Sequence, residues 1–251
     1  MLKLYRKNPE NFALAWIGIY CLIQSLANGL SARIGIPRSA NAVLAAIQSI
    51  YLLWWLHKNH LLGDFRLNKP TQPGKNMLYY LPLLAISTVN LWLGAKMNLT
   101  PAALVFHILL MLCVGFLEEL IFRGFLFEAL RKKGLKIAIV VSSLTFGIGH
   151  IVNLFNGSGM SIGAVLFQMV YAVLFGFLVV TVYLRSGSLI PCIVSHQMVN
   201  ISSAFANHQV LDQGNTKIWI QLPAIALMLL YLLVLCKTAP IQNPEAQKKN
   251  S

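Results

Sequence analysis

The stretch GFLEELIFR, residues 115–123, decides how this sequence is interpreted, because it places three charges inside an apolar run. The run covers residues 102–130, and the whole chain of 251 residues has only 7 acidic side chains. A carboxylate at membrane depth costs on the order of a few kcal/mol, so such a group is retained where a partner or a reaction uses it. The acids of this stretch are therefore candidates for function.

The two adjacent acids of this stretch have different surroundings if the run is a helix. Arg123 follows Glu119 by four residues, which places the two side chains on one helix face as an ion pair. Glu118 points about 100° away from that face, since a helix turns once in about 3.6 residues. We therefore expect a paired acid next to an unpaired one.

The composition indicates an integral membrane protein. Hydrophobic residues make up 57% of the chain and charged residues 11%, against about 25% charged in an average soluble domain. The net charge of +13 does not indicate nucleic-acid binding, because the basic residues collect in short loops between apolar spans, a pattern that sets membrane orientation. The four cysteines fall within apolar spans without a CxxC pair, so we expect neither a disulfide framework nor a zinc knuckle.

Eight apolar spans predict an all-α, polytopic helical bundle. The predicted spans cover residues 12–30, 40–57, 77–95, 102–130, 137–155, 162–184, 189–205 and 218–236. We divide the chain into three N-terminal spans (1–100), a four-helix catalytic core (101–206), and a last span with a polar cytoplasmic tail (207–251). Fifteen Lys and Arg residues fall on the side of the termini and four on the other side, which predicts cytoplasmic termini. The compact size favours a bacterial cytoplasmic membrane.

Two further spans carry polar side chains at membrane depth. His150 lies near the far end of the fifth span, and His196 and Asn200 lie one turn apart on the seventh. A rise of 1.5 Å per residue puts them in roughly the same layer as Glu118. We therefore expect four polar side chains from three helices to converge, although a satisfied core histidine and an asparagine joining two helices are simpler alternatives.

This set of side chains suits hydrolysis by water. A carboxylate and an imidazole can hold and deprotonate a water molecule. A second imidazole and an amide N–H can bind the oxyanion that forms when the water attacks a peptide carbonyl. Neither Cys113 nor Ser195 has a base arranged beside it in the sequence. The pattern therefore favours direct attack by water without an acyl-enzyme.

Three motifs in order resemble the CPBP family. They are Glu-Glu-x-x-x-Arg at 118–123, Phe-x-x-x-His at 146–150 and His-x-x-x-Asn at 196–200, each within an apolar span. That family comprises the CAAX-processing intramembrane endopeptidases (CAAX prenyl protease 2) and bacterial relatives that include bacteriocin-processing and immunity proteins. The resemblance covers about residues 102–205.

The resemblance implies roles for four catalytic residues. Glu118 would activate water as acid and base, and His150 would help to hold that water. His196 and Asn200 would stabilise the oxyanion. No cofactor is implied by this glutamate mechanism.

The resemblance also implies supporting residues and leaves one alternative. Glu119 and Arg123 would form a structural or substrate-orienting pair, and Phe146 would support the site. Members of the family have also been described as metalloproteases, and Glu118, His150 and His196 could in principle bind zinc. The sequence contains no HExxH motif, so zinc is the minority interpretation.

The expected function is hydrolysis of a peptide bond in a membrane-embedded substrate, near the cytoplasmic leaflet. The expected partners are a hydrophobic or prenylated, CAAX-like peptide or protein and membrane lipid, with no nucleic acid. One alternative is a non-catalytic protein of the same fold, acting in bacteriocin immunity or as a membrane regulatory partner. Another is a transporter with the buried acids as a proton relay, although the chain shows no repeat symmetry.

Overall fold

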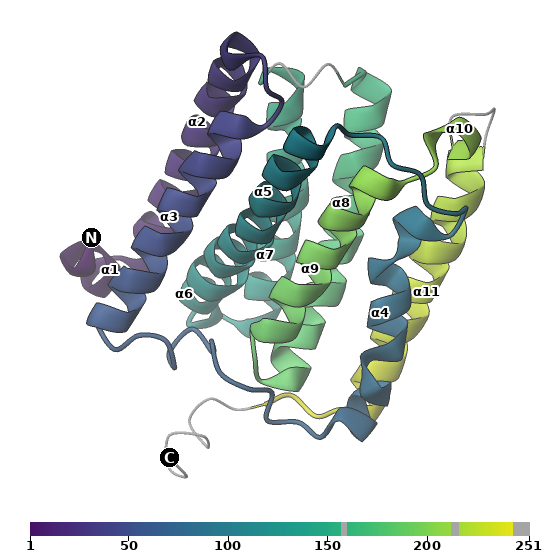
Figure 1. Cartoon of the computed structure of the whole chain (residues 1–251). Coiled ribbons are helices and arrows are strands. Elements are labelled where there is room, and N and C mark those ends of the chain that lie inside the picture. Colours follow the sequence, from purple (N-terminus) through teal and green to yellow (C-terminus); the bar gives the residue numbers. More distant parts are fainter. Residues whose placement is uncertain (157–159, 212–215, 243–251) are drawn as a thin grey trace.

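The computed structural model describes residues 1–156, 160–211 and 216–242. Within these ranges every regular element is a helix. Figure 1 shows the long helices side by side in a bundle, with α2 and α3 at one edge and α4 and α11 at the other. The all-α architecture predicted from the apolar spans is therefore confirmed.

Among the residues that the structure describes, six helical segments are long and apolar enough to cross a membrane. On the outer surfaces of these helices, large apolar side chains such as Leu26 and Ile50 are about two-thirds exposed, which suits contact with lipid. The six segments are α2 (Pro9–Ile34), α3 (Ser39–Lys58), the continuous run Pro101–Arg131, the run Leu135–Leu154, α8 (Ile162–Ser186) and α11 (Thr216–Thr238). Within α11, the apolar stretch of membrane length is Trp219–Thr238.

Two of the eight predicted spans contain helices shorter than membrane length, so six of the roughly eight expected helices reach that length within the described residues. The predicted span 77–95 is broken into η1 (Gly74–Tyr80), α4 (Leu81–Ser87) and η2 (Val89–Leu91). Left-handed backbone at Leu78, Tyr79 and Tyr80 interrupts its start. Such a break leaves the apolar composition unchanged, so hydropathy alone does not reveal it.

The predicted span 189–205 is also shorter than expected. It consists of α9 (Ile190–Ser202), followed by the single turn η5 (Ser203–Phe205). Thirteen helical residues reach only about 20 Å, against the roughly 30 Å of a bilayer core. Both α4 and α9 nevertheless pack within the bundle, α4 against α9 and α11 (Figure 1). The short segments α1 (Leu2–Lys7) and α10 (His208–Leu211) lie outside the predicted spans.

One run of helix forms the centre of the bundle. It consists of α5 (Pro101–Glu119), a π-helical segment η3 (Leu120–Phe127) and α6 (Glu128–Arg131). Proline occupies the first helical position, where its missing N–H costs nothing. All eight residues of η3 are buried, so this segment is surrounded by protein on every side.

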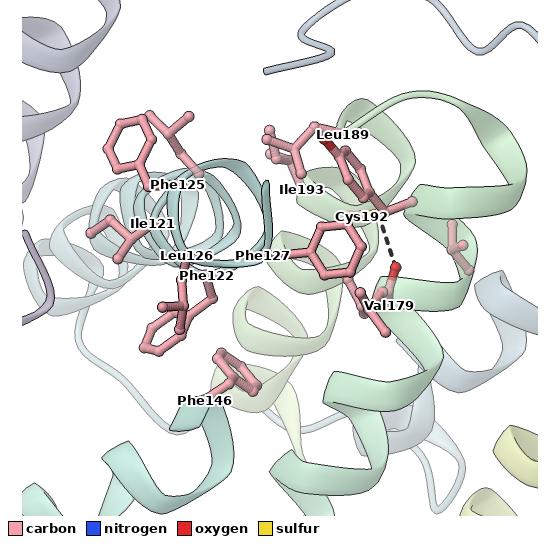
Figure 2. Close-up of a cluster of buried hydrophobic side chains, with 14 of the residues drawn as sticks. Ile121, Phe122, Phe125, Leu126, Phe127, Phe146, Val179, Leu189, Cys192 and Ile193 are labelled. Atoms are coloured by element: carbon pink, nitrogen blue, oxygen red, sulfur yellow. Dashed lines mark hydrogen bonds between the residues drawn. The ribbon is translucent and has the colours of Figure 1, made fainter. Parts of the chain in front are cut away.

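The core around η3 is built from aromatic and aliphatic side chains. Figure 2 shows Phe127 directed toward Val179 and Cys192, while Phe125 lies on another side of the helix. The Cys192 thiol donates a hydrogen bond to the Val179 carbonyl at 3.4 Å, which joins α9 to α8. The ring of Phe127 also meets Tyr183 edge-on, at 5.7 Å between centroids. Well-packed contacts on all sides hold the charged residues next to η3 in fixed positions.

Candidate active site

The four predicted catalytic residues line one cavity of about 300 Å³. Glu118 lies at the end of α5, and His150 lies where α7 (Leu135–Gly149) passes into the 3-10 segment η4 (His150–Leu154). His196 and Asn200 lie on α9. The structure thus brings together the side chains that the sequence placed in one layer, and their catalytic roles remain predictions.

Glu118 is held by two partners at the cavity wall. The Tyr20 hydroxyl on α2 donates a hydrogen bond to Glu118 Oε1 at 2.7 Å, and His196 Nε2 lies 3.7 Å from Oε2. The expectation that Glu118 is unpaired is therefore wrong. Helical spacing reveals partners on the same helix only, whereas both of these come from other helices. Tyr20 is a site residue that sequence reasoning missed, and a hydroxyl in the first apolar span was its only signal.

Glu119 and Arg123 form the predicted ion pair in the core of the protein. The Arg123 Nη1 donates to Glu119 Oε1 at 3.1 Å, and neither side chain is exposed. His196 Nδ1 lies 2.8 Å from the same Oε1. An ionised carboxylate only accepts hydrogen bonds, so we assign the proton of this contact to Nδ1. His196 thus lies between Glu118 and Glu119, an arrangement that the sequence did not predict.

Phe146 connects the charged pair with both histidines. The guanidinium carbon of Arg123 lies 4.1 Å from the centroid of the Phe146 ring, within the range of a cation–π contact. The same ring meets His150 and His196 edge-on, at 5.5 and 5.7 Å between centroids. A side chain in this position fixes the Arg123 plane and limits how far either imidazole can turn.

His150 is oriented by its own helix. Its Nδ1 lies 3.1 Å from the carbonyl oxygen of Phe146, one turn earlier. A carbonyl accepts, so Nδ1 is the donor of this contact and Nε2 is the nitrogen that is left for a ligand. His150 and Asn200 are both half-buried, and His196 is buried. The cavity therefore has a closed side at His196 and more accessible groups at His150 and Asn200.

Glycine allows the helices of the site to approach closely. A Cβ atom at Gly115 would lie 2.6 Å from Cγ of Gln197, next to His196 on α9. A Cβ atom at Gly147 would lie 2.2 Å from Cγ2 of Val173 and 2.8 Å from its backbone nitrogen. Neither distance is tolerated by real side chains. These glycines set the spacing of α5 against α9 and of α7 against α8.

The zinc interpretation of the site concerns Glu118, His150 and His196. Among the residues that the structure describes, no group of three His, Cys, Asp or Glu side chains is arranged to hold a metal ion. Glu118, His150 and His196 line a common cavity, and the Nδ1 contacts of His196 with Glu119 and of His150 with a carbonyl leave Nε2 of each ring for a ligand, so the zinc interpretation stays a prediction.

Comparison with known families identifies the segment that carries this site. Residues 100–202 match the family described as type II CAAX prenyl endopeptidase, Rce1-like. No curated protein and no solved structure matches the chain. The matched residues run from the start of α5 to the end of α9 and include all seven predicted site residues, which confirms the resemblance stated above. This segment is therefore similar to the Rce1-like type II CAAX prenyl endopeptidases, and the match supports an integral membrane endopeptidase in general terms.

Proposed function

We propose that the protein is an intramembrane endopeptidase that hydrolyses a peptide bond in a hydrophobic or lipidated protein segment, with water activated by Glu118. The observation that carries this proposal is the position of the Glu118 carboxylate at the cavity wall, with Tyr20 on one oxygen and His196 near the other. A carboxylate held in this way has one defined direction for accepting a proton.

The reaction follows from the order of the groups around the cavity. A water molecule between Glu118 and His150 gives its proton to the Glu118 carboxylate while its oxygen bonds to the carbonyl carbon of the substrate. The carbonyl oxygen becomes an oxyanion, for which the Asn200 amide N–H and the His196 imidazole are the candidate donors. When the C–N bond breaks, Glu118 returns the proton to the leaving nitrogen, and the carboxylate is regenerated.

The contact with Glu119 suits His196 for this role. Because Nδ1–H is bound to Glu119 Oε1, the ring presents Nε2 to the cavity on the side of Glu118. When both nitrogens carry protons, Nε2–H can bind the oxyanion without release of the Glu119 contact. Glu119 and Arg123 would then act as positioning residues, because they orient the imidazole without touching the substrate.

The walls of the cavity favour an apolar substrate. Glu118 is the only Asp, Glu, Lys or Arg among the residues that line it, and Leu110, Met111, Val114 and Phe122 form part of the wall. A volume of about 300 Å³ lies at the small end of ligand pockets and suits a few residues of extended chain. A folded substrate would have to unwind locally before cleavage.

A peptidase assay on detergent-purified protein tests the proposal. Quenched peptides, some prenylated at a C-terminal CAAX-type cysteine and some plain and apolar, are offered to the wild type and to Glu118→Gln, which keeps the size of the side chain. The substitution removes the carboxylate that accepts and returns the proton, so kcat should fall by at least about 10³-fold. Glu10→Gln is the matched control, because Glu10 forms a surface ion pair with Lys133 that contributes little.

The outcomes separate the remaining alternatives. Cleavage that Glu118→Gln abolishes and that a zinc chelator leaves unchanged supports the glutamate mechanism. Cleavage that the chelator removes and zinc restores favours the metal-dependent mechanism. Equal cleavage by wild type and Glu118→Gln refutes the assigned role of Glu118. A protective effect in cells that survives Glu118→Gln would indicate the non-catalytic immunity or regulatory function.

A further inference from the structure

The last turn of α9 carries a residue of the site and carbonyl groups that the helix itself does not satisfy. The last four carbonyls of a helix have no N–H partner within it, and an unpaired carbonyl at membrane depth is costly. In α9 these carbonyls belong to residues 199–202. Asn200 is one of them, and it lines the cavity. The groups that bind these carbonyls therefore also bear on where the Asn200 side chain lies.

Two side chains from other elements bind carbonyls of this turn. The Asn90 amide of η2 donates to the Val199 carbonyl at 2.8 Å, and His107 Nε2 of α5 lies 3.2 Å from the Asn200 carbonyl oxygen. The Ser203 hydroxyl also donates to the Asn200 carbonyl, at 2.6 Å, but it directly follows α9 in the chain and moves with it. The contact with His107 therefore ties Asn200 to a different helix.

Arg38 determines which nitrogen of His107 carries the proton. Arg38 Nη1 lies 2.6 Å from His107 Nδ1, and a guanidinium offers only donors. Nδ1 must therefore accept, so the ring carries its proton on Nε2, where the Asn200 carbonyl accepts it. Arg38 caps the start of α3, and His107 is only 1% exposed. The imidazole is thus a buried donor with both nitrogens bound and one direction of donation.

His107 and Glu118 lie on the same helix, α5. Glu118 lines the cavity at the end of this helix, about three turns after His107. The neighbouring helix α9 packs along α5, and the Gln197 amide of α9 donates to the Leu112 carbonyl of α5 at 2.8 Å. That contact fixes the middle of α9 against the Glu118 helix, and the His107 contact fixes the last turn, which carries Asn200.

We propose that His107 is a positioning residue of the active site, which holds the Asn200 amide at the cavity wall by binding the Asn200 backbone carbonyl. This inference rests on the proposed function for the role of Asn200 as an oxyanion donor. Such a donor is effective only at a defined distance from the developing charge, and a displacement of about 1 Å can cost about 100-fold in rate. Because both nitrogens of the ring are bound, His107 acts through Asn200 and does not touch the substrate.

Two substitutions of similar length separate hydrogen bonding from packing. His107→Gln keeps an N–H for the Asn200 carbonyl and an oxygen that accepts from Arg38, whereas His107→Met fills similar space with neither group. Tyr231→Phe is the matched control, because Tyr231 is also 1% exposed and its hydroxyl donates to the Met77 carbonyl at 3.0 Å. All variants are assayed in detergent with a quenched peptide that the wild type cleaves.

The expected kinetic result is a loss of kcat that depends on Asn200. His107→Met should lower kcat at least about tenfold and change KM less than about threefold, as for a contact that matters in the transition state. His107→Gln and Tyr231→Phe should stay within about threefold of the wild-type kcat.

A second pair of variants shows whether His107 acts through Asn200. In an Asn200→Ala background, His107→Met should lower kcat less than about twofold, because the amide that His107 positions is absent. The full tenfold loss in that background would overturn the inference. Equal kcat of His107→Met and wild type, or an equal loss in His107→Met and His107→Gln, would overturn it as well.

Hydrogen–deuterium exchange tests the contact without requiring activity. The backbone amides at the end of α9 are followed in peptides that cover residues 197–205. They should exchange at least about fivefold faster in His107→Met, and at the wild-type rate in His107→Gln and Tyr231→Phe. Unchanged exchange in His107→Met would overturn the inference. Absence of cleavage by the wild type counts against the proposed function alone, since the exchange pattern still shows whether His107 holds Asn200.

Discussion

The buried pair Glu119–Arg123 offers the sharpest test of how the site is held together. Both side chains are fully buried, and Arg123 Nη1 lies 3.1 Å from Glu119 Oε1. Glu119→Gln keeps an oxygen at the position where Oε1 accepts hydrogen bonds from Arg123 and His196. The substitution therefore removes mainly the negative charge. Arg123→Met removes the guanidinium and leaves an unbranched side chain that can fill part of the space.

The expected magnitudes follow from burial. Removal of one partner from a buried ion pair leaves an uncompensated charge and costs about 3–5 kcal/mol. Each single variant should lose an amount of this order in the free energy of unfolding. In the double variant neither charge of the pair remains. Its loss in the free energy of unfolding should therefore be smaller than the sum of the two single losses, by about 3 kcal/mol or more. The Arg123→Met loss should be the smaller one, since Glu119 keeps its contact with His196.

The measurement is a double-mutant cycle by SDS-induced unfolding in mixed micelles. The exposed pair Glu10–Lys133 supplies the matched control, because its side chains are 31% and 58% exposed. Its cycle should give a coupling below about 1 kcal/mol. If the losses for Glu119 and Arg123 add to within about 0.5 kcal/mol, the two residues do not depend on each other, and the argument for their pairing fails.

Further predictions concern the Glu118 contact and the helix spacing. Tyr20→Phe removes the hydrogen bond to Glu118 Oε1 and should lower kcat about tenfold with little change in KM. An unchanged kcat would show that the hydroxyl does not position the carboxylate. Gly147→Ala should lower Tm by at least about 4 °C, because its Cβ would lie 2.2 Å from Val173. Gly149→Ala, whose Cβ would meet nothing within 4 Å, should leave Tm unchanged, and an equal loss in both variants would contradict the packing argument.

The sequence predicted those parts of the site that follow from position along a single helix. The Glu119–Arg123 pair depends on a spacing of four residues, and the structure contains it. The common depth of Glu118, His150 and His196 depends on the rise per residue, and the three side chains line one cavity. Local geometry of this kind is set by the backbone, which an apolar span with known ends already defines.

Contacts between helices could not be predicted in the same way. The Tyr20–Glu118 hydrogen bond joins residues 98 positions apart, and the His196–Glu119 contact joins residues 77 positions apart. They depend on how far each helix is rotated about its axis. That rotation is set by packing details such as Gly115 against Gln197, to which a hydropathy pattern is insensitive. The breaks that shorten α4 and α9 were missed for a related reason, since they occur within apolar sequence.

The two adjacent acids at the end of α5 have different surroundings. The segment η3 begins at Leu120, immediately after Glu119. Glu118, on the last turn of α5, faces the cavity, while Glu119 and Arg123 lie wholly in the core. His196 contacts both acids from α9. A charged pair that no solvent reaches therefore orients an imidazole at the edge of the cavity, and this couples the stability of the core to the geometry of the site.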